Sequence, residues 1–239
     1  MSKRVFITGA SRGIGKAIAH TFAQEGYELY LVCKNNLASM QAYADELHHS
    51  YGTAVHCYGI DLADSVSLES FLDTLPDMDV IINNAGISYV GLLTDMSLSD
   101  WNHVVNTNLT SAFLICKKLL PAMIRRHSGK IINISSVWGN VGASTEVAYS
   151  TTKGGINSFT KALAKETAPS NVQVNAIACG LIDTDMNACF SKEDLDDVIA
   201  QIPADRIGKP EEVAALCLQL VQAPDYLTGQ IITLDGGWI

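Results

Sequence analysis

Short apolar runs rich in β-branched residues alternate with longer amphipathic stretches along the whole chain of 239 residues. The short runs predict strands, at Arg4–Thr8, Glu28–Cys33, Val55–Gly59, Val80–Asn83, Lys130–Ser135, Val172–Ala178 and Ile231–Leu234. The longer stretches predict helices, at Ile14–Glu25, Leu37–Tyr51, Ser65–Leu75, Asp100–Arg126, Tyr149–Thr167, Lys192–Gln201 and Glu211–Val221. Most strand runs are apolar throughout, which is typical of central strands covered on both faces.

This regular alternation predicts an α/β fold with a doubly wound parallel sheet and helices on both faces. The sequence has no linker rich in proline, glycine or serine and no internal repeat, so we expect a single domain over residues 1–239. Sheets of this kind bind ligands beyond the carboxyl ends of their strands. The ends of the predicted strands are therefore the places to look for chemistry.

The first strand runs into the sequence Thr-Gly-Ala-Ser-Arg-Gly-Ile-Gly, residues 8–15, and then into a helix. Its glycines permit tight turning and close backbone approach to a ligand. The helix N-terminus offers free N–H groups and the positive end of its dipole to a phosphate. A tight turn without a ligand is the alternative, but the context favours a pyrophosphate site at Gly9, Ala10, Ser11, Arg12, Gly13, Ile14 and Gly15.

The second predicted strand indicates which dinucleotide this loop holds. An NAD site usually has an acidic residue at the end of that strand, where it binds the ribose hydroxyls. Here Lys34 follows the strand without an acid beside it, and Arg12 lies in the glycine loop. Two cations suit a 2′-phosphate, so we predict NADP(H). The alternative, that Lys34 is only a solvated turn residue, stays open.

The next two strand ends supply further candidate contacts for the cofactor. Asp61, with Leu62 beside it, follows the third strand and could meet the adenine edge, although a turn carboxylate that caps a helix is equally compatible. The fourth strand ends in Asn-Asn-Ala-Gly, residues 83–86. Small residues there allow close approach of a cofactor, so Asn84, Ala85 and Gly86 are included among the candidates, although alone they indicate only a turn.

Tyr149 and Lys153 lie four residues apart on a predicted helix and so share one helix face. Ser136 precedes Tyr149 by 13 residues and closes the fifth strand. A phenol, an ammonium and a hydroxyl together could deliver a proton to a carbonyl oxygen. Ser135 is an adjacent hydroxyl, but strand alternation directs it to the opposite face. Taken singly, Ser136 as a strand-end cap or Tyr149 as a core ring is as plausible.

Composition narrows the class of protein. The net charge of −9 argues against a general nucleic-acid binder and against an anionic membrane surface. The six cysteines form no C-x-x-C pair, which favours reduced thiols and a cytoplasmic location. Neither a signal peptide nor a membrane span is predicted. His48 and His49 are neighbours on a predicted helix and do not face one site, so no metal site is predicted.

With these residues assembled, the chain resembles the short-chain dehydrogenase/reductase family over essentially its whole length. The resemblance is carried by residues 8–15, residues 83–86, Asn108 in Asn-Thr-Asn-Leu-Thr, Ser136, the pair Tyr149 and Lys153, and residues 180–184. It implies a Rossmann-type sheet of about seven strands, a nicotinamide cofactor and usually a homotetramer.

The resemblance also implies roles for individual residues. Tyr149 would be the general acid, and the charge of Lys153 would favour its phenolate while Lys153 also holds the nicotinamide ribose. Ser136 would orient the substrate oxygen, and Asn108 would hold a water that links Lys153 to solvent. Ile182 and Thr184 would contact the nicotinamide carboxamide or a nearby phosphate.

Within the family the chain is most similar to bacterial 3-oxoacyl-[acyl-carrier-protein] reductases, on the motifs around residues 108–113, 180–186 and 202–213. This implies NADPH-dependent reduction of a 3-oxoacyl thioester, with acyl carrier protein as partner, in fatty acid synthesis. Cys179 replaces the family's usual proline, and beyond Arg125 and Arg126 few arginines are placed to meet an acidic carrier.

A second resemblance is to bacterial reductases that act on the 5-aminopentanone modification of elongation factor P, and it implies a different ketone. It is carried by residues 91–95, 135–139 and 142–147 and by the terminal Gly-Gly-Trp. A third reading, a non-catalytic protein that senses NADP(H), is disfavoured because a pure sensor does not need a proton donor. Residues 183–202 are expected to form a helical lid, in which Met186, Phe190 and Leu195 line the pocket, pack the lid down, or do both.

Overall fold

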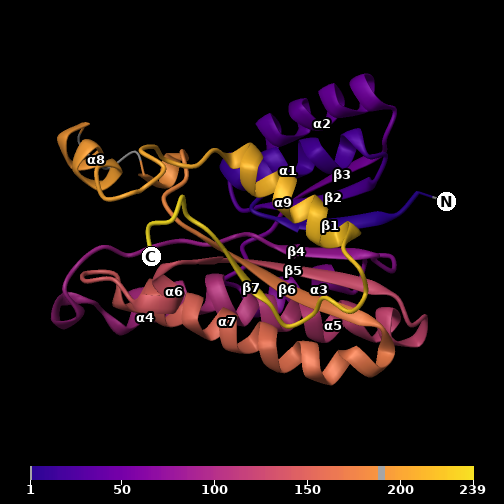
Figure 1. The fold of residues 1–239 in the computed structure, drawn as a ribbon. Helices are drawn as coiled ribbons and strands as arrows, with labels where there is room; N and C mark the ends of the chain where they lie inside the picture. The colour runs from indigo at the N-terminus through magenta and orange to yellow at the C-terminus, as the bar shows by residue number, and fades with distance from the viewer. Residues whose placement is uncertain (1, 188–191) are drawn as a thin grey trace.

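The fold is a single parallel sheet of seven strands with helices on both faces (Figure 1), in a computed structural model that describes residues 2–187 and 192–239. The strand order is β3-β2-β1-β4-β5-β6-β7. The strands are β1 (Arg4–Thr8), β2 (Glu28–Cys33), β3 (Val55–Gly59), β4 (Val80–Asn83), β5 (Gly129–Ser136), β6 (Val172–Cys179) and β7 (Ile231–Leu234). The predicted Rossmann-type α/β fold is confirmed, and β5 and β6 run slightly beyond the predicted limits.

Side-chain alternation along the strands divides the core into two layers. Val5 and Ile7 of β1 pack on one face, under α1 (Gly13–Gln24), α2 (Leu37–Tyr51) and α9 (Pro210–Gln222). Phe6 packs on the other face, with helices α3 (Ser65–Leu72), α5 (Ser111–Arg125) and α7 (Val147–Thr167). Figure 1 shows these two helix layers above and below the sheet.

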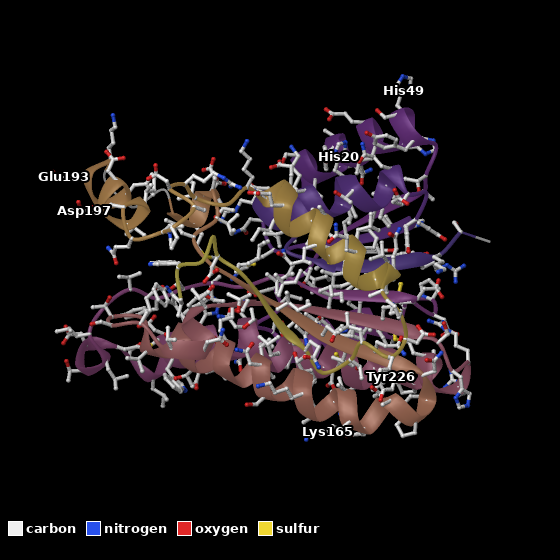
Figure 2. The ribbon with its side chains drawn as sticks, viewed as in Figure 1. His20, His49, Lys165, Glu193, Asp197 and Tyr226 are labelled. Atoms are coloured by element: carbon white, nitrogen blue, oxygen red, sulfur yellow. The ribbon has the colours of Figure 1, made fainter. Side chains whose placement is uncertain are left out.

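The remaining elements are short. They are α6 (Trp138–Val141), α8 (Lys192–Ile199) and the 3-10 turns η1 (Leu93–Asp95), η3 (Ala168–Ser170) and η4 (Asp185–Asn187). His48 and His49 are exposed at the end of α2, and Figure 2 shows His49 directed away from the sheet. Within residues 2–187 and 192–239, none of the helices is both long and apolar enough to cross a membrane.

One predicted helix is wrong in the structure. The pattern predicted one helix over Asp100–Arg126, but the chain forms α4 (Leu98–Val105), a π-helical turn η2 (Asn106–Thr110) and then α5. A π turn inserts one residue into the helical register, and such turns are frequent at functional sites. The polar contacts that hold this turn come from outside the helix, so periodicity could not reveal it.

Candidate active site

A cavity of about 1200 Å³ opens along the carboxyl ends of the strands. Ligand pockets typically measure roughly 300–1,000 Å³, so this one has room for a dinucleotide and a substrate together. Of the predicted site residues, those that line it are Gly9, Ser11, Arg12, Gly13, Ile14, Gly15, Lys34, Asp61, Leu62, Asn84, Ala85, Gly86, Ser136, Tyr149, Lys153, Ile182 and Thr184. Ala10 and Asn108 are not part of the cavity wall.

The glycine loop is packed against the turn that follows β4. A Cβ on Gly15 would lie 2.2 Å from the Gly9 carbonyl oxygen, and a Cβ on Gly9 would lie 2.9 Å from Ala85 Cα. Asn84 Nδ2 donates to the carbonyl oxygens of Thr8 at 2.8 Å and Gly9 at 3.2 Å. Because α1 begins at Gly13, its first N–H groups have no acceptor within the helix. The loop is therefore shaped to hold a pyrophosphate.

Ala10 has its side chain in the core and not in the cavity. It is fully buried, and its N–H donates to the Val32 carbonyl oxygen at 3.1 Å. Its backbone N–H is thus already committed to the neighbouring strand.

Lys34 and Arg12, the two cations predicted to meet a 2′-phosphate, both have carboxylate partners. Lys34 Nζ lies 2.8 Å from Asp61 Oδ2, and Arg12 Nη1 lies 3.3 Å from Asp185 Oδ2. Burial opposes ionisation of Asp61, but hydrogen bonds from Lys34 and from the Ala63 N–H hold its pKa below the ordinary value. The sequence predicted two cations here and no acid at the end of β2, whereas the fold brings Asp61 and Asp185 to these cations. A 2′-phosphate would compete with both.

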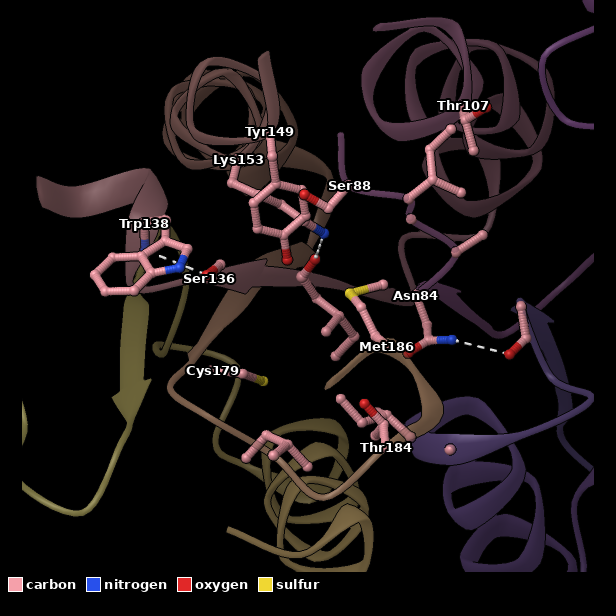
Figure 3. Close-up of a pocket in the computed structure, with 18 of the residues that line it drawn as sticks. Asn84, Ser88, Thr107, Ser136, Trp138, Tyr149, Lys153, Cys179, Thr184 and Met186 are labelled. Atoms are coloured by element: carbon pink, nitrogen blue, oxygen red, sulfur yellow. Dashed lines mark hydrogen bonds between the residues drawn. The ribbon is translucent and has the colours of Figure 1, made fainter. Parts of the chain in front are cut away.

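Lys153 and Tyr149 project together from α7 toward the end of β5 (Figure 3). Lys153 Nζ donates to the Ile134 carbonyl oxygen at 2.7 Å and lies 5.5 Å from the centroid of the Tyr149 ring. Burial lowers the pKa of Lys153 to about 8. A Cβ on Gly86 would come within 3.3 Å of Nζ, which explains the need for a small residue at that position.

The pKa of Tyr149 is shifted in the opposite direction from the one expected. Burial raises the pKa of Tyr149 well above its ordinary value, a hydrogen bond with Ser136 lowers it, and nearby Cys179 and Glu146 raise it further. Desolvation is the largest contribution, and it outweighs the lowering expected from the charge of Lys153. A protonated phenol beside the Ser136 hydroxyl is suited to giving a proton to an oxygen that gains negative charge.

Asn108 lies in the π turn and holds the loop after β4. Its Oδ1 accepts from the Ile87 N–H at 2.8 Å, and its Nδ2 donates to the Ile87 carbonyl oxygen at 2.9 Å and to Thr152 Oγ1 at 3.0 Å. Both amide hydrogens are used in these bonds. The predicted water contact would therefore need other atoms of Asn108, and in the structure its side chain is a clamp between the loop and α7.

Ser135 and Cys179 lie beside the reacting groups. Ser135 Oγ donates to Asn157 Oδ1 at 2.6 Å, which commits it to α7 and leaves Ser136 beside Tyr149. Cys179 pairs with Ser136 in the β5–β6 register and lines the cavity. Burial raises the pKa of the Cys179 thiol to about 12.

Sequence reasoning missed the other end of the cavity, which is lined by Ser88, Trp138, Glu146 and Trp238 among others. Ser88 Oγ donates to Glu146, and the two indole rings meet edge-to-face with centroids 5.0 Å apart. Trp138 is close in sequence to Ser136, and Glu146 is close to Tyr149. This proximity was the signal that could have identified them as cavity residues.

The segment expected to form a lid contributes Met186 and Val198 to the cavity wall. Figure 2 shows Glu193 and Asp197 on the outer side of α8. Leu195 is half-buried and not part of the wall, and Phe190 lies outside the described residues.

A parallel sheet whose strand ends carry a glycine loop and a tyrosine–lysine pair in one cavity is the arrangement expected of a nucleotide-dependent oxidoreductase. The family model for short chain dehydrogenase matches residues 3–195. The chain therefore belongs to the short-chain dehydrogenase/reductase family and is an oxidoreductase of the nicotinamide-dependent type.

Individual relatives match over nearly the full length. The chain is 38% identical to the uncharacterized oxidoreductase YmfI of Bacillus subtilis, over 100% of this chain and 99% of the relative. It is 42% identical to the 3-oxoacyl-[acyl-carrier-protein] reductase FabG of Aquifex aeolicus, over 97% and 95% of the two chains.

Solved structures agree in fold and differ in bound cofactor. A 3-oxoacyl-[acyl-carrier protein] reductase from Brucella melitensis with bound NAD has a TM-score of 0.91 at 33% identity, covering 99% of this chain and 91% of that one. A candidate NAD(P)-dependent gluconate 5-dehydrogenase from Beutenbergia cavernae with bound NADP has a TM-score of 0.92 at 32% identity, covering 99% and 96%.

Proposed function

We propose that this protein is an NADPH-dependent reductase that converts a ketone to a secondary alcohol. The observation that carries the proposal is the convergence of Tyr149, Lys153 and Ser136 in the cavity that the glycine loop also lines. When bound, the nicotinamide supplies the hydride that forms the new C–H bond at the carbonyl carbon.

The side chains supply the proton and the orientation. Ser136 and Tyr149 donate hydrogen bonds to the substrate oxygen, and Tyr149 transfers its proton as the C=O π electrons move onto that oxygen. Lys153 stabilises the phenolate left behind through its positive charge, and Tyr149 recovers a proton from solvent. The net change is ketone plus NADPH plus a proton to alcohol plus NADP⁺.

A 3-oxoacyl thioester on acyl carrier protein is our first choice of substrate. The similarity to a reductase of that name over almost the whole chain supports it. The second candidate is the 5-aminopentanone modification of elongation factor P, and one observation favours it: Glu146 places a carboxylate at the substrate end of the cavity.

Parallel assays separate the two substrates. NADPH oxidation is followed at matched concentrations of acetoacetyl carrier protein and of elongation factor P that carries the aminopentanone. Turnover of the thioester supports the first choice. Turnover of the modified factor alone rejects it and leaves the ketone reductase assignment in place.

We propose NADPH over NADH because Arg12 and Lys34 lie at the adenosine end and no acid closes β2. Asp61 makes this preference smaller than two unpaired cations would give. Comparing kcat/KM for the two cofactors with one substrate tests it, and a preference for NADH would overturn the assignment.

We further propose a cytoplasmic homotetramer, on the strength of family resemblance. Light scattering coupled to size exclusion measures the mass in solution, and a monomer would contradict the tetramer. The chemistry proposed above needs no nucleic acid and no membrane.

A further inference from the structure

Glu146 occupies a position that helix capping does not explain. It is the residue before α7, three positions ahead of Tyr149, and its side chain makes no capping hydrogen bond to that helix. Its carboxylate instead lines the cavity and lies near enough to Tyr149 to disfavour ionisation of the phenol. Glu146 is thus close to the place where the carbonyl reacts.

The loop after β4 fixes this carboxylate in position. Ser88 Oγ donates to Glu146 Oε1, and Ser88 lines the same cavity as Tyr149. The Gly91 N–H donates to the Thr145 carbonyl oxygen at 2.8 Å, next to Glu146 in the chain. Ile87, beside Ser88, is held by both ends of the Asn108 amide. A charged group held this way is preorganised to select a ligand.

The charges of the cavity are unevenly distributed. Asp61 and Asp185 line the cavity, and each pairs with a cation of the adenosine end. Lys153 directs its ammonium to the Ile134 carbonyl oxygen. Across residues 2–187 and 192–239, Glu146 forms no ion pair. Within the described residues, the carboxylate of Glu146 is therefore held by the Ser88 hydroxyl and is not neutralised by a direct ion pair.

We infer that Glu146, held by Ser88, selects ketone substrates that carry a positive charge over uncharged ketones of the same shape. This rests on the proposed ketone reductase function and narrows its substrate class. A carboxylate in a partly desolvated cavity attracts a cation more strongly than it would in open water. The indole pair of Trp138 and Trp238 in the same cavity wall adds aromatic surface, which cations also favour.

Two esters of acetoacetate test the inference, because they match in shape and differ in charge. One is the ester of choline, and the other is the ester of 3,3-dimethylbutanol, in which a carbon replaces the quaternary nitrogen. We expect the wild-type kcat/KM to be about tenfold higher for the choline ester, and the ratio to fall toward one at high salt.

Glu146→Gln removes the charge and keeps an acceptor for Ser88. We expect the ratio of the two kcat/KM values to fall about tenfold in this variant. Loss of the Glu146 charge also changes the pKa of Tyr149. This change affects the turnover of both esters equally and so cancels in the ratio. Asp95→Asn is the matched control, because Asp95 is exposed in η1 outside the cavity wall and its loss changes the net charge equally. It should leave the ratio unchanged.

Calorimetric titration of the two esters into the NADPH-saturated protein distinguishes a failure of the inference from a failure of the proposed function. A wild-type protein that treats the two esters alike, or a ratio that Glu146→Gln leaves intact, overturns the inference while the reductase function stands. If neither ester is reduced, the proposed function is in question, and the inference is then decided by whether Glu146→Gln weakens binding of the choline ester alone.

Discussion

Around Tyr149 the protein works against ionisation of the phenol. Burial and the charge of Glu146 raise its pKa, and only the hydrogen bond with Ser136 opposes them. A phenol that holds its proton is available as a donor to an oxygen that gains negative charge, which is the role proposed for Tyr149. The burial behind this pKa shift is a property of the finished fold that the spacing of Tyr149 and Lys153 could not reveal.

Tyr149→Phe removes the proton donor and keeps the ring. We expect kcat to fall by about 10²–10⁴, the usual contribution of a general acid. NADPH binding, measured by quenching of tryptophan fluorescence, should change less than threefold, roughly within 1 kcal/mol. Retained turnover would refute the assignment of Tyr149, and loss of turnover with cofactor binding intact would also reject a purely sensing protein.

Lys153 gives a prediction about stability and pH. Its folded pKa of about 8 lies below the ordinary value of 10.5 because the ammonium is buried. Between these values the unfolded chain binds a proton that the folded chain has released, so this group makes the protein more stable as pH rises through that window. The penalty from burying the charged form is fully present below about pH 8.

Lys153→Met removes this titration while keeping an unbranched side chain. Compared by urea unfolding at pH 7.5 and pH 9.5, wild type should gain about 2 kcal/mol relative to the variant as pH rises. Most other groups titrate alike in the two proteins, so their contributions cancel in the difference between the two free energies of unfolding. An unchanged difference would mean that the ammonium is hydrated in the folded protein.

The proximity of the proposed catalytic residues was predictable because one helix and one strand end carry them. Tyr149 and Lys153 share α7, and Ser136 ends the neighbouring strand. Glu146 and Ser88 were not predictable, because their hydrogen bond joins positions 58 residues apart through a loop. Local spacing carries no information about such a contact.

Among the elements, the π turn η2 is one that the hydrophobic pattern of the sequence could not predict. A single extra residue hardly disturbs the apolar periodicity, so the sequence predicted one continuous helix from residue 100 to 126. The turn exists because Asn108 finds partners in Ile87 and Thr152, and these contacts depend on the finished fold. Five of the seven strands, in contrast, match their predicted ends, because buried parallel strands read as apolar runs.

Asn108→Ala removes the clamp and leaves the partly buried N–H and carbonyl groups of Ile87 without these partners. We expect a loss of about 2–4 kcal/mol in the free energy of unfolding, and lower activity because Ser88 and the turn after β4 lose their support. Asn106→Ala in the same turn is the control, since among the described residues its side chain accepts a single bond, from Thr110 at 3.3 Å. Equal losses in the two variants would show that the clamp has no special role.

Across the whole molecule, the order of strands decides which distant residues meet. The carboxyl ends of β1, β4, β5 and β6 lie side by side, so the glycine loop, the turn after β4 and the proposed catalytic residues share one cavity. That much follows from alternating strands and helices. The carboxylate partners of Arg12 and Lys34 do not follow from this alternation. Asp185, which pairs with Arg12, lies 173 residues further along the chain.

Because Arg12 is paired with Asp185, the proposed binding of NADP(H) should be linked to the segment of residues 183–202. A 2′-phosphate that engages Arg12 must compete with this carboxylate, so Asp185→Asn should bind NADPH about two- to fivefold more tightly, as expected for an exposed ion pair. NADH lacks the 2′-phosphate, so its affinity should rise less. Fluorescence titration of both cofactors measures the difference.

Asp183→Asn supplies the matched control for the charge change, because Asp183 is exposed in the same segment and does not line the cavity. It should leave the ratio of the two affinities unchanged. The Asp185→Asn effect should also shrink at high salt, because exposed charges are screened there. If Asp185→Asn strengthens both cofactors equally, Arg12 does not meet the 2′-phosphate, and Lys34 alone would have to account for any preference for NADPH.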